Sequence, residues 1–262
     1  MMASLAILAA LSFVAAIVLA LGHLRHRAVR KQRNLFGEWP IERVPPEAVD
    51  PVLRPGPFGP TRDTEVAFIG RGPYVVDGGT SDAEAWILAV LAKRARRMFE
   101  FGTCTGKTAY LWARNAPDDA RIVTLTLPPQ GLGEYRAGAG DDPGDGRAAL
   151  TESAFERFLY SDTPQAGKVT QLFGDSKSID LSPWKGQCDL VFVDGSHGYS
   201  YVKSDSERAV DLVRPGGIVL WHDYVGRSHS PGVFQALNEL AQRLPLARIA
   251  GTSIVAYRRP TA

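Results

Sequence analysis

The sequence predicts an α/β protein with a Rossmann-like, mostly parallel β-sheet covered by helices on both faces, preceded by a single N-terminal transmembrane helix. Three observations support this prediction. From residue 81 onward, short apolar runs alternate with segments of helical periodicity, which is typical of parallel sheets. The chain has 262 residues, of which 45% are hydrophobic and 22% are charged, and this suffices for one sizeable core. Finally, residues 1–21 carry no charge.

The uncharged N-terminal run has the length of a membrane span. A helix over 1–21 would extend about 31 Å at about 1.5 Å per residue, close to the ~30 Å hydrocarbon core of a bilayer. Basic residues follow between Arg25 and Arg33 and, by the positive-inside rule, favour a cytoplasmic location for the rest of the chain. We therefore expect a retained anchor over 1–24 and a single-pass membrane protein with a cytoplasmic domain. A cleaved signal peptide is the alternative, but the run lacks a preceding basic region.

Two stretches of unusual composition mark the domain boundaries. The basic and proline-rich segment 25–65 is expected to be a linker, because proline fixes φ and lacks an N–H donor. The domain is then expected over 66–262. Within it, the Gly- and Asp-rich segment 128–147 is too polar to bury and is expected to be a mobile lid or disordered.

The elements of this domain follow from periodicity and from capping signals. Ser81 and Glu84 form a capping box before the first helical pattern. Pro215 and the two glycines after it end the helix expected at 201–213. Helices are expected at 83–97, 105–116, 149–160, 201–213 and 232–244, and strands at 98–102, 121–127, 168–175, 188–194, 217–223 and 251–259.

The loop after the strand 98–102 contains Gly106-Lys107-Thr108, the end of a phosphate-binding P-loop pattern. That pattern requires its first glycine at position 101, where the chain has Phe101, and the nearest glycine is Gly102. Glu100 also precedes this loop, and a carboxylate repels phosphate but attracts an ammonium or sulfonium group. The loop therefore favours a cationic, amino-acid-like ligand, and a P-loop nucleotide hydrolase remains the alternative.

Other polar residues follow the remaining strands, where parallel sheets bind their ligands. They are Asp175 and Ser176 after the strand 168–175, Asp194 with the nearby His197 after the strand 188–194, and His222 with Asp223 after the strand 217–223.

Four motifs together resemble those of class I S-adenosylmethionine-dependent methyltransferases. They are E-x-G-x-x-x-G at 100–106, GDS at 174–176, FVDGSHGYSYVKSD at 192–205 and RPGGIVLWHDY at 214–224. The chain is most similar to bacterial small-molecule O-methyltransferases of the macrocin O-methyltransferase type. This resemblance covers about 66–262 and implies methyl transfer from S-adenosylmethionine to a hydroxyl of a small-molecule acceptor.

The resemblance also assigns residues to the cofactor. Glu100, Gly102, Thr103 and Gly106 would surround its methionine part, and Asp175 and Ser176 would lie beside its adenine. Thr126 stands where the family usually has an acidic residue that binds both ribose hydroxyls. This departure keeps a further alternative open, a catalytically degenerate methyltransferase fold that acts as a membrane-tethered interaction module.

A divalent cation, Mg²⁺ or Mn²⁺, is a second expected cofactor. Asp194 and Asp223 end strands that should be neighbours, and in related metal-dependent O-methyltransferases a cation binds there. His222 would be the third ligand, and imidazole favours Mn²⁺ over Mg²⁺. Asp194, His197 and His222 are the expected catalytic residues, because without a metal one of the two histidines could act as the base.

The remaining expectations concern surface residues and partners. Asp205 and Glu207 are expected on a solvated helix face, and Lys107 is expected to be exposed in the first turn of a helix. The net charge of +2 gives no bias toward nucleic acid. The expected partners are the small-molecule acceptor and the membrane, and the sequence does not determine the oligomeric state.

Overall fold

The computed structural model describes residues 2–30, 39–54, 79–129 and 135–261. They belong to two compact units, residues 1–40 and residues 41–262. In the first unit, α1 (Met2–Arg30) is a helix with no acidic residue in its first turn. The described strands all lie in the second unit.

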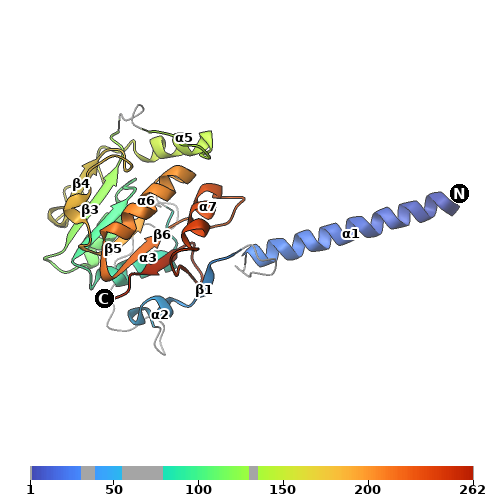
Figure 1. Cartoon of the computed structure of the whole chain (residues 1–262), viewed down its shortest axis with the longest axis horizontal. Helices are drawn as coiled ribbons and strands as arrows, with labels where there is room; N and C mark the ends of the chain where they lie inside the picture. Colours follow the sequence, from blue (N-terminus) through green and yellow to red (C-terminus); the bar gives the residue numbers. More distant parts are fainter. Residues whose placement is uncertain (1, 31–38, 55–78, 130–134, 262) are drawn as a thin grey trace. The chain divides into compact units, whose positions relative to one another are not determined.

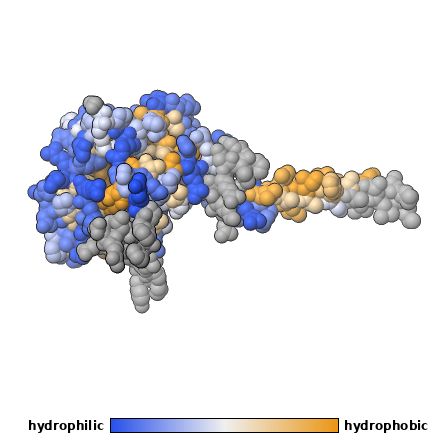
Figure 2. Space-filling view, turned by 90° about the horizontal axis from the view of Figure 1, so that it is seen from below, coloured by the Kyte–Doolittle hydropathy of each residue, from blue (hydrophilic) through white to orange (hydrophobic). Residues whose placement is uncertain are grey.

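The expected membrane anchor is contradicted. Apolar side chains such as Leu11 and Phe13 are exposed on α1, and Figure 2 shows apolar residues gathered along this helix. Nevertheless, no helix in the described part of the chain combines the length and the apolar character that crossing a membrane requires. The prediction was made from the length of the uncharged run 1–21 and from the basic residues that follow it. The transmembrane helix over 1–24, the membrane as a partner and the single-pass location are therefore corrected.

The described residues of the second unit form an eight-stranded sheet in the order β1-β7-β8-β6-β5-β2-β3-β4 (Figure 1). All neighbouring pairs are parallel except those of β8 with β6 and with β7. The strand order reverses beside β2, which pairs with β3 on one side and with β5 on the other. The strands are β1 (Glu42–Val44), β2 (Arg97–Phe101), β3 (Arg121–Thr126), β4 (Val169–Phe173), β5 (Cys188–Val193), β6 (Val213–Trp221), β7 (Ala247–Ile249) and β8 (Val255–Arg258).

Helices cover both faces of this sheet, as the alternating pattern predicts. Met98 and Phe192 belong to the same buried core as residues of α3 and α4, which pack together. Trp221 points to the opposite face, where its indole N–H donates to Ser206 Oγ of α6 at 2.9 Å, and α6 packs on α7. The α-helices of this unit are α2 (Pro46–Val49), α3 (Asp82–Ala92), α4 (Lys107–Asn115), α5 (Pro143–Glu152), α6 (Tyr199–Leu212) and α7 (Pro231–Leu240), and the short 3-10 turns are η1 (Pro51–Leu53), η3 (Ala166–Lys168) and η4 (Ser182–Trp184).

Three elements differ from the expectation. Residues 41–54, expected in the linker, include β1, α2 and η1, so the compact unit begins at Ile41 and not at residue 66. Residues 55–65 of the expected linker lie outside the described residues. The helix expected at 149–160 is α5, which begins earlier at Pro143, where Asp142 forms a capping box, and ends at Glu152 rather than at 160. The expected lid over 128–147 is described from residue 135 onward, where Asp141 accepts hydrogen bonds from the backbone N–H and the hydroxyl of Ser200.

Candidate functional site

The loop after β2 is shaped by two glycines with positive φ. Gly102 has a φ of 95° and Gly106 has a φ of 77°, and Gly106 is the N-cap of α4. A Cβ on Gly102 would lie 2.0 Å from the carbonyl oxygen of Asp194, so the ends of β2 and β5 meet without room for a side chain. This close approach explains why glycine is needed at 102 and brings Asp194 beside the loop.

A pocket opens at the carboxyl ends of β2, β3, β4 and β5. It contains about 520 Å³ of space between atoms, part of it open to solvent. Among the residues expected to bind a cofactor, Gly102, Thr126 and Ser176 line it. The pocket lies where the strand order reverses, which is the usual ligand position in open α/β sheets.

Glu100 and Thr103, which were also expected to bind the cofactor, are buried and do not line the pocket. Glu100 is 1% exposed, and its carboxylate accepts a 2.6 Å hydrogen bond from Thr124 Oγ1. Burial, assisted by the negative charge of Asp194, raises the pKa of Glu100 to about 8, although hydrogen bonds from Thr124 and Thr108 oppose the shift. Thr103 is also buried and shares a hydrogen bond of 2.7 Å with Thr124.

Gly106 and Asp175 complete the expected cofactor set. Gly106 packs against Phe158 and Tyr160 rather than lining the pocket. Asp175 is 5% exposed, and its Oδ1 accepts a hydrogen bond from the backbone N–H of Lys177. Its Oδ2 is buried without a hydrogen-bond partner among the described residues, and the adjacent Ser176 lines the pocket.

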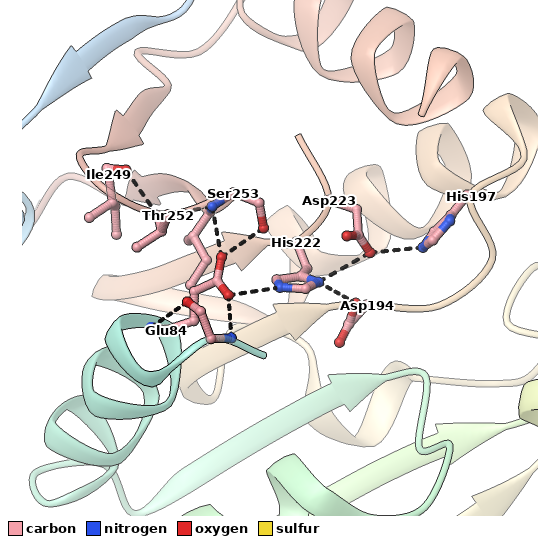
Figure 3. A network of polar contacts seen from close by, with 10 residues as sticks. Glu84, Asp194, His197, His222, Asp223, Ile249, Thr252 and Ser253 are labelled. Carbon is pink, nitrogen blue, oxygen red and sulfur yellow. Dashed lines mark hydrogen bonds and ion pairs between the residues drawn. The ribbon is translucent and has the colours of Figure 1, made fainter. Parts of the chain in front are cut away.

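The two aspartates and the two histidines at the ends of β5 and β6 form one connected network (Figure 3). His222 Nδ1 lies 3.1 Å from Asp194 Oδ1 and 3.1 Å from Asp223 Oδ2. His197 Nε2 lies 2.9 Å from the same Asp223 oxygen. A second, smaller pocket is lined by His197, His222 and Asp223, and it shares Asp194 with the larger one. The structure thus brings together all the residues predicted to act in catalysis.

The network continues to Glu84 of α3, which the sequence analysis placed only in a capping box. Glu84 is 4% exposed, and its Oε2 lies 3.5 Å from His222 Nε2. Burial alone would raise the pKa of Glu84, but the hydrogen bond and the positive charge of His222 lower it to about 2. The charges are therefore arranged as an alternating chain of carboxylates and imidazoles.

This arrangement raises the pKa of both histidines. The hydrogen bond to Asp223 raises the pKa of His197 to about 9, against the opposing effect of burial. Burial opposes the charge of His222 too, but Asp194, Asp223 and Glu84 raise its pKa far above the usual range. Both imidazoles consequently favour their protonated forms around neutral pH, and the two aspartates have cationic partners within the protein itself.

Asp194, His197 and Asp223 form a possible metal site among the described residues. Each offers one ligand atom, and these atoms lie within 4.8 Å of one another. This set of two carboxylates and one imidazole fits a divalent cation such as Mn²⁺ better than Mg²⁺. His222, the third ligand expected from the sequence, is not in this set, although its Nδ1 lies 3.1 Å from an oxygen of each aspartate.

Several pocket residues were missed or misplaced by the sequence analysis. Tyr135 and Glu152 line the larger pocket and come from the segment expected to be a lid and from α5. Asp205, expected on a solvated helix face, also lines it and is only 2% exposed, and burial raises its pKa to about 7. Glu207 is exposed as expected, whereas Lys107 begins α4 but is buried. Only the helical spacing of Asp205 from the buried Tyr201 and Val202 signals its inward position.

Comparisons with known proteins agree with this geometry. Residues 99–224 match the family model described as a methyltransferase domain. The uncharacterized protein y4gI of Sinorhizobium fredii is 44% identical over 185 residues, which cover 70% of this chain but only 18% of that protein. The chain thus spans less than a fifth of the length of this relative.

Two solved structures are similar to this chain, and of these two the first reaches a TM-score of 0.50 and supports the fold. A protein from Corynebacterium glutamicum superposes with a TM-score of 0.50 at 13% identity, covering 71% of this chain and 84% of that one. The O-methyltransferase TomG from Streptomyces achromogenes, solved in complex with S-adenosylmethionine, has a TM-score of 0.48 at 23% identity and covers 69% of this chain and 82% of its own.

Proposed function

Because the chain carries a methyltransferase domain of class I fold, we propose that it transfers a methyl group from S-adenosylmethionine to a hydroxyl of a small-molecule acceptor. The observation that carries this proposal is the position of Asp194, which lines both the larger pocket and the smaller one that holds His197 and Asp223. A cofactor in the first pocket would therefore lie directly beside acid–base groups in the second.

The larger pocket offers suitable groups for each part of the cofactor. The Gly102 loop supplies close backbone approach for the methionine part, with the carboxylate of Asp194 near its sulfonium. Thr126 would offer one hydroxyl to the ribose, and Ser176 with the neighbouring Asp175 would face the adenine. A cationic sulfonium beside ionised carboxylates is electrostatically favourable.

The proposed reaction is an in-line displacement at the methyl carbon. The acceptor oxygen forms a bond to the methyl carbon while the S–C bond of the cofactor breaks. The electron pair of the S–C bond stays on the sulfur, which becomes a neutral thioether. Without a bound cation, the hydroxyl proton passes to the neutral fraction of His197, which grows as the pH rises toward its pKa of about 9, and Asp223 stabilises the imidazolium that forms. His222 is less suited to this task, because both of its ring nitrogens already face carboxylates.

We propose Asp194, His197 and Asp223 as the ligands of a divalent cation, since their ligand atoms converge. A bound cation would lower the pKa of the acceptor hydroxyl and orient it toward the methyl group. Titration with Mn²⁺, followed by electron paramagnetic resonance, tests the site. Asp223→Asn should weaken binding by about tenfold or more, while Asp118→Asn, an exposed control, should not. Equal Mn²⁺ affinities in both variants would contradict this ligand set.

Calorimetric titration of the full chain with S-adenosylmethionine, its demethylated product and ATP tests the proposed function. We expect S-adenosylmethionine to bind with a Kd on the order of 1–100 μM and ATP not to bind. Gly102→Ala should abolish binding, because its Cβ would collide with the Asp194 carbonyl. Gly167→Ala is the matched control, since a Cβ there meets nothing within 4 Å. Tight ATP binding without S-adenosylmethionine binding would favour the nucleotide hydrolase, and binding of neither would favour the degenerate fold.

A further inference from the structure

We propose that Glu84 is a positioning residue for this site and that it holds Asp194 and Asp223 in place through His222. Glu84 lines neither pocket, so any effect on a ligand must pass through another residue. The ligand-binding part of the test rests on the proposed function, whereas the hydrogen-bond geometry of His222 can be tested without it.

The carboxylate of Glu84 is fixed from two directions. Its Oε1 accepts hydrogen bonds from the backbone N–H of Ser253 at 2.7 Å and from the Ser253 hydroxyl at 2.8 Å. Its Oε2 accepts a 2.7 Å hydrogen bond from the backbone N–H of Ser81. Since α3 and the segment before β8 both hold this side chain, the carboxylate presents a rigid acceptor to the ring of His222.

The ring of His222 has little freedom between its acidic neighbours. Its side chain is 6% exposed, and Phe192 meets it edge-on with ring centroids 5.9 Å apart. Nε2 is buried without a hydrogen bond to the described residues and forms an ion pair with Glu84 at 3.5 Å, while Nδ1 lies 3.1 Å from an oxygen of Asp194 and 3.1 Å from an oxygen of Asp223. Favourable contacts at both ends require an N–H on each nitrogen. The acceptor at Nε2 therefore sets the direction in which Nδ1–H bridges the two aspartates.

Helix capping alone does not account for the placement of Glu84. In the capping box, Ser81 Oγ accepts from the backbone N–H of Glu84 at 3.4 Å, and the Glu84 side chain accepts from the backbone N–H of Ser81. A cap of this kind forms equally well at an exposed helix start. Burying a carboxylate is costly unless it is paired, and the buried partner of this carboxylate is His222.

The capping box provides a matched control for the test. Glu84→Gln keeps the length of the side chain and one acceptor oxygen, but its amide would present N–H groups to His222 Nε2. Ser81→Ala removes the hydroxyl of the cap, while the backbone N–H of residue 81 still reaches the Glu84 carboxylate. Both variants weaken the start of α3, and only the first changes what faces His222.

The first measurement is the affinity of the full chain for S-adenosylhomocysteine. Since Asp194 lines the larger pocket, we expect Glu84→Gln to weaken binding about tenfold, as losses of groups that orient a ligand residue commonly do. Ser81→Ala should stay within about twofold of the wild type, the scatter expected for a remote helix cap. The same loss in both variants, or no loss in Glu84→Gln, would overturn the proposal.

The second measurement uses the imidazole N–H resonances of the chain labelled with ¹⁵N-histidine, which contains five histidines. The wild type and Ser81→Ala should show two slowly exchanging ring protons for His222, with Nδ1–H the more deshielded because its carboxylate oxygens lie at 3.1 Å and that of Glu84 lies 3.5 Å from Nε2. Glu84→Gln should lose the Nε2–H resonance and shift the Nδ1–H resonance. An unchanged spectrum in Glu84→Gln would overturn the positioning role, even if the variant were less stable.

Two further outcomes separate this proposal from the proposed function. A wild type that does not bind S-adenosylhomocysteine, but whose His222 resonances respond to Glu84→Gln, refutes the methyltransferase function and supports the positioning role. If Glu84→Gln fails to fold, Ser253→Ala replaces it, because it removes one of the two Ser253 donors to Oε1. It should move the His222 resonances in the same direction by a smaller amount, and unchanged resonances would overturn the proposal.

Discussion

Thr126 lies at the end of β3 on the wall of the larger pocket, where an acidic residue would bind both ribose hydroxyls. Two charged hydrogen bonds to a diol are stronger than one bond from a neutral hydroxyl. Thr126→Asp should therefore tighten binding of S-adenosylhomocysteine by about tenfold, or about 1.4 kcal/mol.

Calorimetry measures the affinity of Thr126→Asp for S-adenosylhomocysteine, and Thr170→Asp serves as the control variant. Thr170 is exposed on the neighbouring strand β4 and away from the pocket lining, so it controls for the added negative charge. Unchanged affinity in Thr126→Asp would place the ribose elsewhere.

Glu100 makes the stability of the protein depend on pH. Burial raises its pKa from 4.5 to about 8, so the folded state retains a proton that the unfolded state releases. This contribution to the free energy of unfolding is fully present below pH 4.5 and is lost as the pH rises to about 8. Its size is on the order of a few kcal/mol at most.

Urea unfolding of the wild type and Glu100→Gln at several pH values measures this effect. The glutamine cannot ionise, so the wild type should lose more stability than Glu100→Gln between pH 5 and pH 8. Glu156→Gln, at an exposed position, should retain the wild-type pH dependence. Parallel curves for the wild type and Glu100→Gln would show that Glu100 does not titrate in this range.

At the residue scale, the sequence predicted the aspartates and histidines of the site but not their connections. Asp194, His197, His222 and Asp223 each follow a strand, and strand ends gather at one edge of a parallel sheet. Glu84 could not be predicted as their neighbour, because a capping box explains the residue locally and its contact with His222 exists only after α3 packs on the sheet.

At the element scale, the strands in the centre of the sheet were easier to predict than those at its edge. β2, β3 and β5 are rich in apolar residues and are buried over most of their length, because both of their faces are covered. β1 and β7 have three residues each, and both contain an arginine, so neither has a recognisable period. They form because they pair with each other and β7 pairs with β8.

The segment 41–54 is an integral part of this edge, although its composition resembles a linker. Ile41 and Leu53 are at most 2% exposed, and the guanidinium of Arg258 contacts the carbonyl of Val49 and the carboxylate of Asp50. Each fully buried aliphatic side chain contributes roughly 1.5–3 kcal/mol. A chain shortened to 55–262 should therefore be several kcal/mol less stable than one shortened to 41–262.

Chemical denaturation of the two shortened chains makes this comparison. The chain 41–262 should unfold cooperatively, because it comprises the whole compact unit. Equal denaturation midpoints for the two chains would mean that β1, α2 and η1 add no stability to the sheet.

At the scale of the whole molecule, the alternation of strands and helices sufficed to predict a parallel sheet covered on both faces. The family match at 99–224 falls within this sheet, from β2 to the segment after β6. The N-terminal expectation was wrong, although the length of the run, its lack of charge and the basic residues after it all favoured a membrane span. The compact unit begins at Ile41 and not at the expected residue 66. Residues 42–44 form a strand because they pair with β7, which lies near the C-terminus and cannot be recognised from the local sequence.

The pairing of β1 with β7 also sets an order of events during synthesis. Arg248 donates to the carbonyl of Ile41, a residue that precedes it by 207 positions. At roughly 5–20 residues per second, a ribosome needs about 10–40 s to make the intervening chain. β1 emerges first but must wait for β7, while β2, β3, β4 and β5 can pair as they appear. The first of the described strands is thus among the last of them to join the sheet.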